Sequence, residues 1–212
     1  VYTADTAAGQ KNFKDPVFSP DGTIIVFAYE VLTTSYLARV SAADGTVFTT
    51  LTTAPLSYAS PSFYPDSVAR DEVLVVAGNG IGQYTQLDRI NISTGQILPV
   101  TNNLGTEAVS ISGRAVLSKD GTKVAFDARI FSMTTATRIF VQTLSTGATV
   151  RVSETGAGSG DALHSFPTWI SASQVAFVSN EGGANQVYVQ SASTRGTGSL
   201  TLPSADQAWF GP

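Results

Sequence analysis

The stretch DPVFSPDGTIIVF at Asp15 to Phe27 returns as RAVLSKDGTKVAF at Arg114 to Phe126. Shorter copies read SPSFYPD at Ser60 to Asp66 and FPTWISASQVAF at Phe166 to Phe177. A phrase that recurs along a chain at such spacing is the signature of a fold that repeats one small unit. The sequence therefore predicts a repeat architecture before any single strand is assigned.

Each copy joins short β-branched and aromatic segments through tight turns. Asp21-Gly22 and Asp120-Gly121 carry the turn signal of a hairpin whose central residues need positive φ. No segment shows a sustained apolar period of 3.6, so we expect almost no helix. Four antiparallel strands in roughly 40 to 50 residues are typical of a β-propeller blade. We predict an all-β propeller whose four recognisable blades cover residues 16–52, 61–101, 115–154 and 167–202.

The two ends of the chain add strand-like segments at residues 1–5 and 208–212. Residues 1–212 then form a single propeller domain or a segment of one. Two arrangements stay open: a stretch of a larger ring, or a four-bladed ring that its terminal strands seal. A third reading has the exposed end strands pair between copies, which would make the protein a self-assembling structural unit.

Composition removes several classes of function. The chain has 12 Lys and Arg against 16 Asp and Glu, so it lacks the basic footprint that nucleic-acid binding requires. It has no cysteine, which excludes disulfides and thiolate metal sites. No apolar run approaches the roughly 18 residues of a membrane span. Because the chain begins at Val1, we expect either a removed targeting segment or a piece of a longer protein.

The phrase PVFSPDGTIIVF and the hairpin SNEGGANQVYVQSAS resemble the TolB-like, WD-repeat-like propeller family. The match is strongest in the first copy. The second has Ser67 where glycine is expected, the third has Lys119 for a proline, and the fourth has Ser171-Ala172-Ser173 for Pro-Asp-Gly. The resemblance implies a periplasmic or secreted scaffold that binds proteins. It also admits the propeller of a polysaccharide-active enzyme or the gating domain of a serine peptidase. The motif residues form turns, so they specify fold and leave activity open.

Catalytic signatures are weak. His164 is the only histidine, and one histidine makes no histidine-rich metal site. A Ser-His-Asp triad would have to use it, yet the nucleophile elbow G-x-S-x-G is missing. No pair of carboxylates stands out for glycoside hydrolysis. We therefore predict no enzyme activity, no metal and no cofactor.

One residue directly precedes the strand opener of each copy, and these four equivalent residues are Asp15, Ser60, Arg114 and Phe166. In a propeller these positions ring one mouth of the channel, where loops bind partners. We predict a partner- or ligand-binding set of Asp15, Arg114, Asp161 and His164. The alternatives are ordinary loop polarity and, for His164, a loop histidine bonded to nearby backbone.

Bulky rings recur at comparable first-strand positions, Phe18, Phe63, Trp169 and Trp209, and Leu117 occupies this position in the third copy. We expect each of them to pack between neighbouring blades as part of the core. The leading function is then a non-catalytic extracytoplasmic scaffold that presents loops to another protein or to a neighbouring domain.

Overall fold

The computed structural model describes residues 10–46, 48–53, 56–65, 71–79, 84–101, 108–130, 136–154, 162–181 and 183–196. Within these ranges the regular structure consists of β-strands, and no helix occurs. No helical segment there has the length and hydropathy to cross a membrane. The predicted all-β class is confirmed for this part of the chain. The terminal strands predicted at 1–5 and 208–212 lie outside it.

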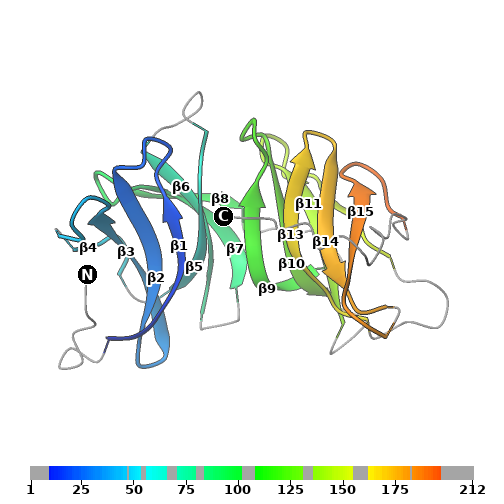
Figure 1. The fold of residues 1–212 in the computed structure, drawn as a ribbon, viewed down its shortest axis with the longest axis horizontal. Helices are drawn as coiled ribbons and strands as arrows, with labels where there is room; N and C mark the ends of the chain where they lie inside the picture. The colour runs from blue at the N-terminus through cyan, green and yellow to red at the C-terminus, as the bar shows by residue number, and fades with distance from the viewer. Residues whose placement is uncertain are drawn as a thin grey trace.

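The strands form successive antiparallel sheets, one for each copy of the repeat (Figure 1). Blade one contains β1 (Gln10–Phe18), β2 (Ile24–Val31), β3 (Thr34–Ser41) and β4 (Thr49–Thr50). Blade two contains β5 (Ser57–Phe63), β6 (Glu72–Gly78), β7 (Tyr84–Asn91) and β8 (Ile97–Thr101). In both blades each strand pairs with the next one along the chain.

The second half of the chain repeats this order. Blade three contains β9 (Ala108–Leu117), β10 (Lys123–Ile130), β11 (Thr137–Thr143) and β12 (Thr149–Arg151). Blade four contains β13 (His164–Ser171), β14 (Gln174–Ser179) and β15 (Gln186–Ser191), and the segment predicted as its fourth strand lies outside the described residues. One pair, Tyr84 with Ile111, joins blades two and three into a continuous eight-stranded sheet.

Blades one and two occupy the left half of the molecule in Figure 1, and blades three and four occupy the right half. The first strand of each later blade packs against the blade before it: β5 against β1, β2 and β3, β9 against β5, β6 and β7, and β13 against β9, β10 and β11. The described residues form an open array of blades rather than a closed ring.

Apolar clusters fill the spaces between consecutive blades. Val26 and Leu37 of blade one meet Val75 of blade two in the first of these clusters. Phe126 lies in the second cluster, between blades two and three, and Phe177 in the third, between blades three and four. A central strand that is covered on both faces needs apolar residues at nearly every position, which explains runs such as VLVVA in β6 of blade two. Each fully buried side chain of this size contributes about 1.5–3 kcal/mol.

The turn between the first two strands depends on one aspartate. In blade one Asp21 Oδ1 accepts hydrogen bonds from Ser19 Oγ at 2.7 Å and from Thr23 N at 3.0 Å, and Gly22 has φ +72°. In blade three Asp120 makes the same contacts, and the hydrogen bonds from Ser118 and Thr122 lower the pKa of its carboxyl to about 2. The repeated Asp-Gly motif therefore stabilises the turn between the first two strands.

The first strand of each blade contains a bulge just before the repeat motif. Partner positions shift between Lys14 and Val17 in β1, and the same shift recurs in β5, β9 and β13. The ladder continues on the N-terminal side of the bulge, so the strands begin several residues before the predicted openers. Proline at the bulge in three blades has no N–H to give the ladder. The motif therefore marks the bulge rather than the start of the strand.

The prediction that bulky first-strand rings pack between blades is confirmed for two of them. Phe63 packs against the first inter-blade cluster and Trp169 against the third. It is wrong for Phe18, which is 64% exposed. Phe18 lies beside Ile25 on the face of blade one that points away from blade two, where no described sheet covers it. Trp209 lies outside the described residues.

Candidate functional site

The residues that precede the repeat motif form what we call the bulge row: Asp15, Ser60, Arg114 and Phe166. Three of them, Asp15, Ser60 and Phe166, have φ between +53° and +54°. Residues other than glycine rarely adopt such φ values, and bulges of this kind re-aim side chains at sheet rims. The row therefore has an unusual backbone geometry that repeats from blade to blade.

Hydrogen bonds join the members of the bulge row across blade boundaries. The backbone N–H of Ser60 donates to Oδ2 of Asp15 at 3.2 Å, from blade two to blade one. The hydroxyl Oγ of Ser60 then accepts from the backbone N–H of Ala115 at 3.2 Å, from blade three to blade two. Ser60 is buried and Asp15 is exposed. Within the row, Ser60 thus lies in the interior of the fold and Asp15 faces solvent.

Arg114 is anchored through its backbone. Its N–H donates to Oδ1 of Asp127 at 2.8 Å, and Asp127 is buried within β10 of the same blade. The side chain of Arg114 is exposed. Asp15 in blade one and Arg114 in blade three are therefore exposed groups of opposite charge at equivalent positions of the bulge row, with blade two between them. The strands that carry these two residues, β1 and β9, both pack against β5 of blade two, which lies between them.

His164 lies in a different environment from the one predicted. The sequence placed it in a loop before the first strand of blade four, but it is the first residue of β13 and is 1% exposed. Its ring stacks on Phe177 with centroids 5.3 Å apart and an interplanar angle of 15°. Its backbone N–H donates to Oγ1 of Thr137, which in turn donates to its carbonyl oxygen. The backbone bonding expected of a loop histidine thus occurs within a strand.

The ring of His164 is buried as a neutral imidazole. Neither ring nitrogen has a hydrogen-bond partner among the described residues. Burial, followed by the charge of Arg138, lowers the pKa of His164 to about 4. The guanidinium of Arg138 is itself buried, and its Nη1 donates to the carbonyl oxygens of Thr137 and Ala162 at 2.8 and 2.6 Å. The interface between blades three and four thus contains a charged group and a neutral base.

Asp161, the fourth predicted site residue, lies outside the described residues. Of the other three, Asp15 and Arg114 are exposed at equivalent positions of blades one and three, and His164 is buried between two blades. Among the described residues no three His, Asp or Glu side chains gather as metal ligands. The exposed groups suit polar contacts and charge complementarity with a partner.

Sequence reasoning did not assign a role to Asp127 or Arg138. Asp127 interrupts the apolar strand KVAFDARI at the position where blade one has Ala28 and blade four has Val178. A lone carboxylate inside a buried strand needs a hydrogen-bond partner. The interruption of the apolar run by Asp127 could therefore have identified this residue from the sequence. Arg138 is the second residue of β11. Charged residues are common near strand ends, so its position in the sequence did not indicate burial.

Comparisons with known proteins identify the fold but give no closer relationship. No protein-family model and no curated protein sequence match this chain. TolB from Acinetobacter baumannii matches with a TM-score of 0.60 and 19% identity, over 84% of this chain and 40% of that one. An oligogalacturonate lyase in complex with manganese matches with a TM-score of 0.63 and 15% identity, over 85% and 48%.

A Mycobacterium tuberculosis puromycin-hydrolyzing peptidase is also similar, with a TM-score of 0.60 and 12% identity, over 90% of this chain and 29% of that one. The chain thus spans less than half the length of these three structures. The resemblance to TolB-like propellers is supported at the level of fold, because identities this low carry no further inference.

Proposed function

We propose that this chain is a non-catalytic, extracytoplasmic scaffold that binds another protein or a neighbouring domain through the bulge row. The observation that carries the proposal is the chain of hydrogen bonds from Asp15 through Ser60 to Ala115, which crosses two blade boundaries. It fixes the backbone beneath the exposed side chains of Asp15 and Arg114 before any partner arrives. Pre-organised groups lose less conformational entropy on binding.

The chemistry of the row favours a polar partner surface of mixed charge. Asp15 and Arg114 present one negative and one positive group, and Phe166, which is 65% exposed, adds an apolar contact. Charged groups at a rim steer association and select partners more than they add affinity. An exposed aromatic side chain can provide the buried centre that stable interfaces need. His164 would act from within, since its ring supports the strand that presents Phe166.

The non-catalytic part of the proposal is supported by the weak catalytic signatures of the sequence and by a bulge row that contains one carboxylate and one guanidinium. The matched structures include both TolB and enzymes. The extracytoplasmic location rests on the family resemblance of the repeat motif. The test therefore needs a binding arm and a catalytic arm.

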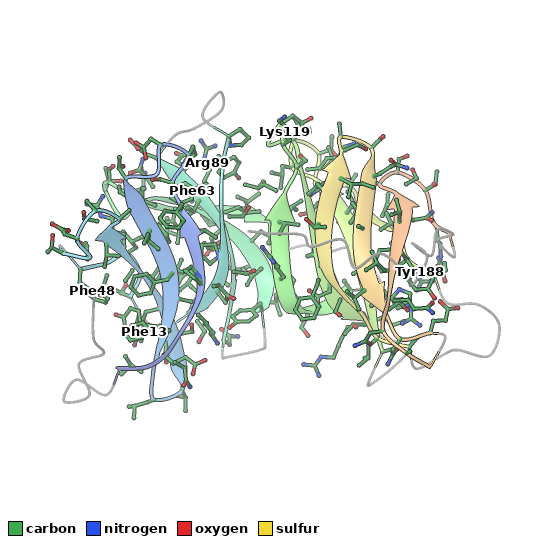
Figure 2. All side chains as sticks on the ribbon, viewed as in Figure 1. Phe13, Phe48, Phe63, Arg89, Lys119 and Tyr188 are labelled. Carbon is green, nitrogen blue, oxygen red and sulfur yellow. The ribbon has the colours of Figure 1, made fainter. Side chains whose placement is uncertain are left out.

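The binding arm uses the 212-residue chain as bait for secreted and periplasmic proteins of its source organism, followed by titration calorimetry with the purified partner. Arg114→Glu should weaken binding at least about ten-fold, because it reverses a charge in the contact. Lys119→Glu is the matched control: it makes the same charge change at an exposed turn beyond the end of β9 (Figure 2).

Two outcomes would overturn the proposal. Equal affinities for the Arg114→Glu and Lys119→Glu variants would move the partner away from the bulge row. In the catalytic arm, turnover of oligogalacturonates or of peptide substrates by the purified chain, above that of a heat-denatured sample, would make the protein an enzyme.

A further inference from the structure

Strand β13 and the residues just before it include a short stretch that we call the entry segment, residues 162–166, which ends at the bulge. Only two of its residues, His164 and Ser165, pair with β14. Pro167 at the bulge has no N–H to give to the ladder. Pairing with β14 resumes at Thr168. The bulge therefore separates the entry segment from the rest of the strand.

Two side chains at the start of β11 tie the entry segment to blade three. Thr137 Oγ1 accepts from the backbone N–H of His164 at 3.2 Å and donates to the carbonyl oxygen of the same residue at 2.8 Å. Nη1 of Arg138 donates to the carbonyl oxygen of Ala162 at 2.6 Å. These hydrogen bonds fix the backbone at the point where the ring of His164 enters the interface between the two blades.

The ring of His164 belongs to an aromatic stack that crosses blade four. It stacks on Phe177 of β14, which stacks in turn on Tyr188 of β15 with centroids 5.9 Å apart. Both ring nitrogens of His164 are buried without a hydrogen-bond partner among the described residues. An imidazolium has two N–H donors and a full charge, so its burial without partners costs far more than burial of the neutral ring. The stack therefore suits only the neutral form.

The charged side chains around β13 are mostly cationic. β13 packs against β9, β10, β11 and β14. The charged residues of those strands are Arg114 of β9, Lys123, Asp127 and Arg129 of β10, and Arg138 of β11. The one carboxylate among them, on Asp127, accepts the backbone N–H of Arg114 at 2.8 Å. Burial, followed by the charge of Arg138, lowers the pKa of His164, so the surroundings oppose an added proton.

We propose that the entry segment is an acid-sensitive latch: protonation of His164 releases residues 162–166 from blade three while the rest of the fold stays in place. In the released state water solvates both ring N–H groups and screens the charge of Arg138. Release stops at the bulge, so it leaves the hydrogen bond from Trp169 Nε1 to the carbonyl oxygen of Val116 intact. The opening is therefore local.

The size of the effect follows from the two states of the ring. The pKa of His164 is about 4 in the closed state and returns to the ordinary 6.5 once the ring is solvated. A group that binds its proton more tightly in the open state favours opening as pH falls. Between pH 7.5 and pH 5 the ratio of open to closed molecules should rise about 30-fold.

This inference does not rest on the proposed function, because the opening needs no partner. It does have a consequence for the bulge row, since Phe166 is the last residue of the entry segment. Release would move Phe166, so a partner held through the bulge row would be bound less tightly in mild acid. A failure of the latch would leave the binding proposal as it stands, and the reverse also holds.

Hydrogen–deuterium exchange of the 212-residue chain at pH 7.5 and pH 5 tests the release. Protection of peptides that cover residues 162–166, corrected for the intrinsic pH dependence of amide exchange, should fall about 30-fold at pH 5. Urea below the unfolding transition distinguishes local opening from global unfolding. It should leave exchange in these peptides unchanged, because little surface is exposed, and it should accelerate exchange in peptides from β6 and β7 of blade two.

Three variants separate the proton from the hydrogen bonds. His164→Phe should abolish the pH effect in the entry segment. Thr137→Val removes both hydrogen bonds to His164, so it should speed exchange of residues 162–166 at both pH values and keep the 30-fold ratio. Thr34→Val is the matched control, because Thr34 is the first residue of β3 as Thr137 is of β11. It should leave the entry segment unchanged.

Nuclear magnetic resonance gives a second readout in the wild-type chain. His164 is the only histidine, so its ring signals are unambiguous, and their titration midpoint should lie below pH 6.5. A midpoint at or above pH 6.5 would overturn the proposal, because the closed state would then accept the proton. So would protection of residues 162–166 that does not change with pH, that depends on urea as blade two does, or that keeps its pH effect in His164→Phe.

Discussion

The carboxylate of Asp15 accepts a hydrogen bond from the backbone N–H of Ser60, a residue 45 positions later in the equivalent place of the next blade. Ser60 extends the same pattern, because its hydroxyl accepts from Ala115 N in blade three. Blades one and two thus each supply an acceptor for a backbone donor of the following blade. Neighbouring blades in this molecule are therefore held together by hydrogen bonds as well as by apolar packing.

Removing the central link should therefore cost stability. In Ser60→Ala the N–H of Ala115, which is 2% exposed, loses its acceptor. A buried donor left without a partner costs about 1–3 kcal/mol, so the free energy of unfolding should fall by that amount in urea denaturation. Ser93→Ala, at an exposed turn, should change it by less than about 0.5 kcal/mol. Equal effects of the two substitutions would show that the link contributes nothing.

His164 should make the protein sensitive to mild acid. Its pKa is lowered from 6.5 to about 4 in the folded chain, so the unfolded chain binds the proton first as pH falls. Its contribution to stability is complete above pH 6.5 and is lost as pH falls toward 4. Between pH 7 and pH 5 the free energy of unfolding should decrease by about 2 kcal/mol from this residue.

The His164→Phe variant isolates that effect, because the chain has no other histidine. Phenylalanine keeps an aromatic ring against Phe177 and cannot take a proton in this range. Urea denaturation at several pH values should show that the variant lacks the loss of stability between pH 7 and pH 5 that His164 causes in the wild type. An identical slope in both proteins would assign the acid sensitivity to other groups.

How much of the fold was predictable depends on which signals are local. The turns follow from Asp21 and Gly22 alone, since side-chain acceptance and positive φ are properties of a few neighbouring residues. The order of strands follows from the repeat. The exposure of Phe18 was not predictable, because its sequence context matches that of Trp169. What differs is whether a blade lies in front of it, which is a property of the whole array.

In the candidate site, too, the features set by local sequence could be predicted and those set by contacts between blades could not. The equivalent positions of Asp15 and Arg114 before the repeat motif could be predicted from spacing, and their strands both pack against β5. The burial of His164 was not readable, because the strand extends through the bulge to a residue that sequence spacing assigns to a loop. The hydrogen bond from Ser60 to Asp15 joins two blades and leaves no local trace in sequence. Contacts between repeats need the stacking geometry.

Asp88 should destabilise the folded chain at neutral pH. It is 1% exposed within β7, and burial raises the pKa of its carboxyl while hydrogen bonds from Gln86 partly offset this. A raised pKa in the folded state means that stability is greatest at low pH and is lost as pH rises through that value. Asp88→Asn, which mimics the protonated acid, should raise the free energy of unfolding at pH 7 by up to about 1 kcal/mol.

The pH dependence provides the control for Asp88. The advantage of Asp88→Asn over wild type should shrink as pH is lowered, because the wild-type carboxyl then becomes neutral as well. Gln86→Ala should act in the opposite direction at pH 7, since it removes the donor that stabilises the ionised form. An advantage that stays constant from pH 7 to pH 4 would show that ionisation of Asp88 is not its source.

Gly22 tests whether the repeat motif acts through backbone conformation. Its φ is +72°, and no atom lies within 4 Å of the place where a Cβ would stand. Gly22→Ala therefore adds no clash, and its cost is the strain of a left-handed conformation, about 1 kcal/mol. Gly22→Asn should cost less, because asparagine tolerates this region better. Chemical denaturation should rank wild type above Asn and Asn above Ala, and an Ala variant as stable as wild type would mean that the turn relaxes to another conformation.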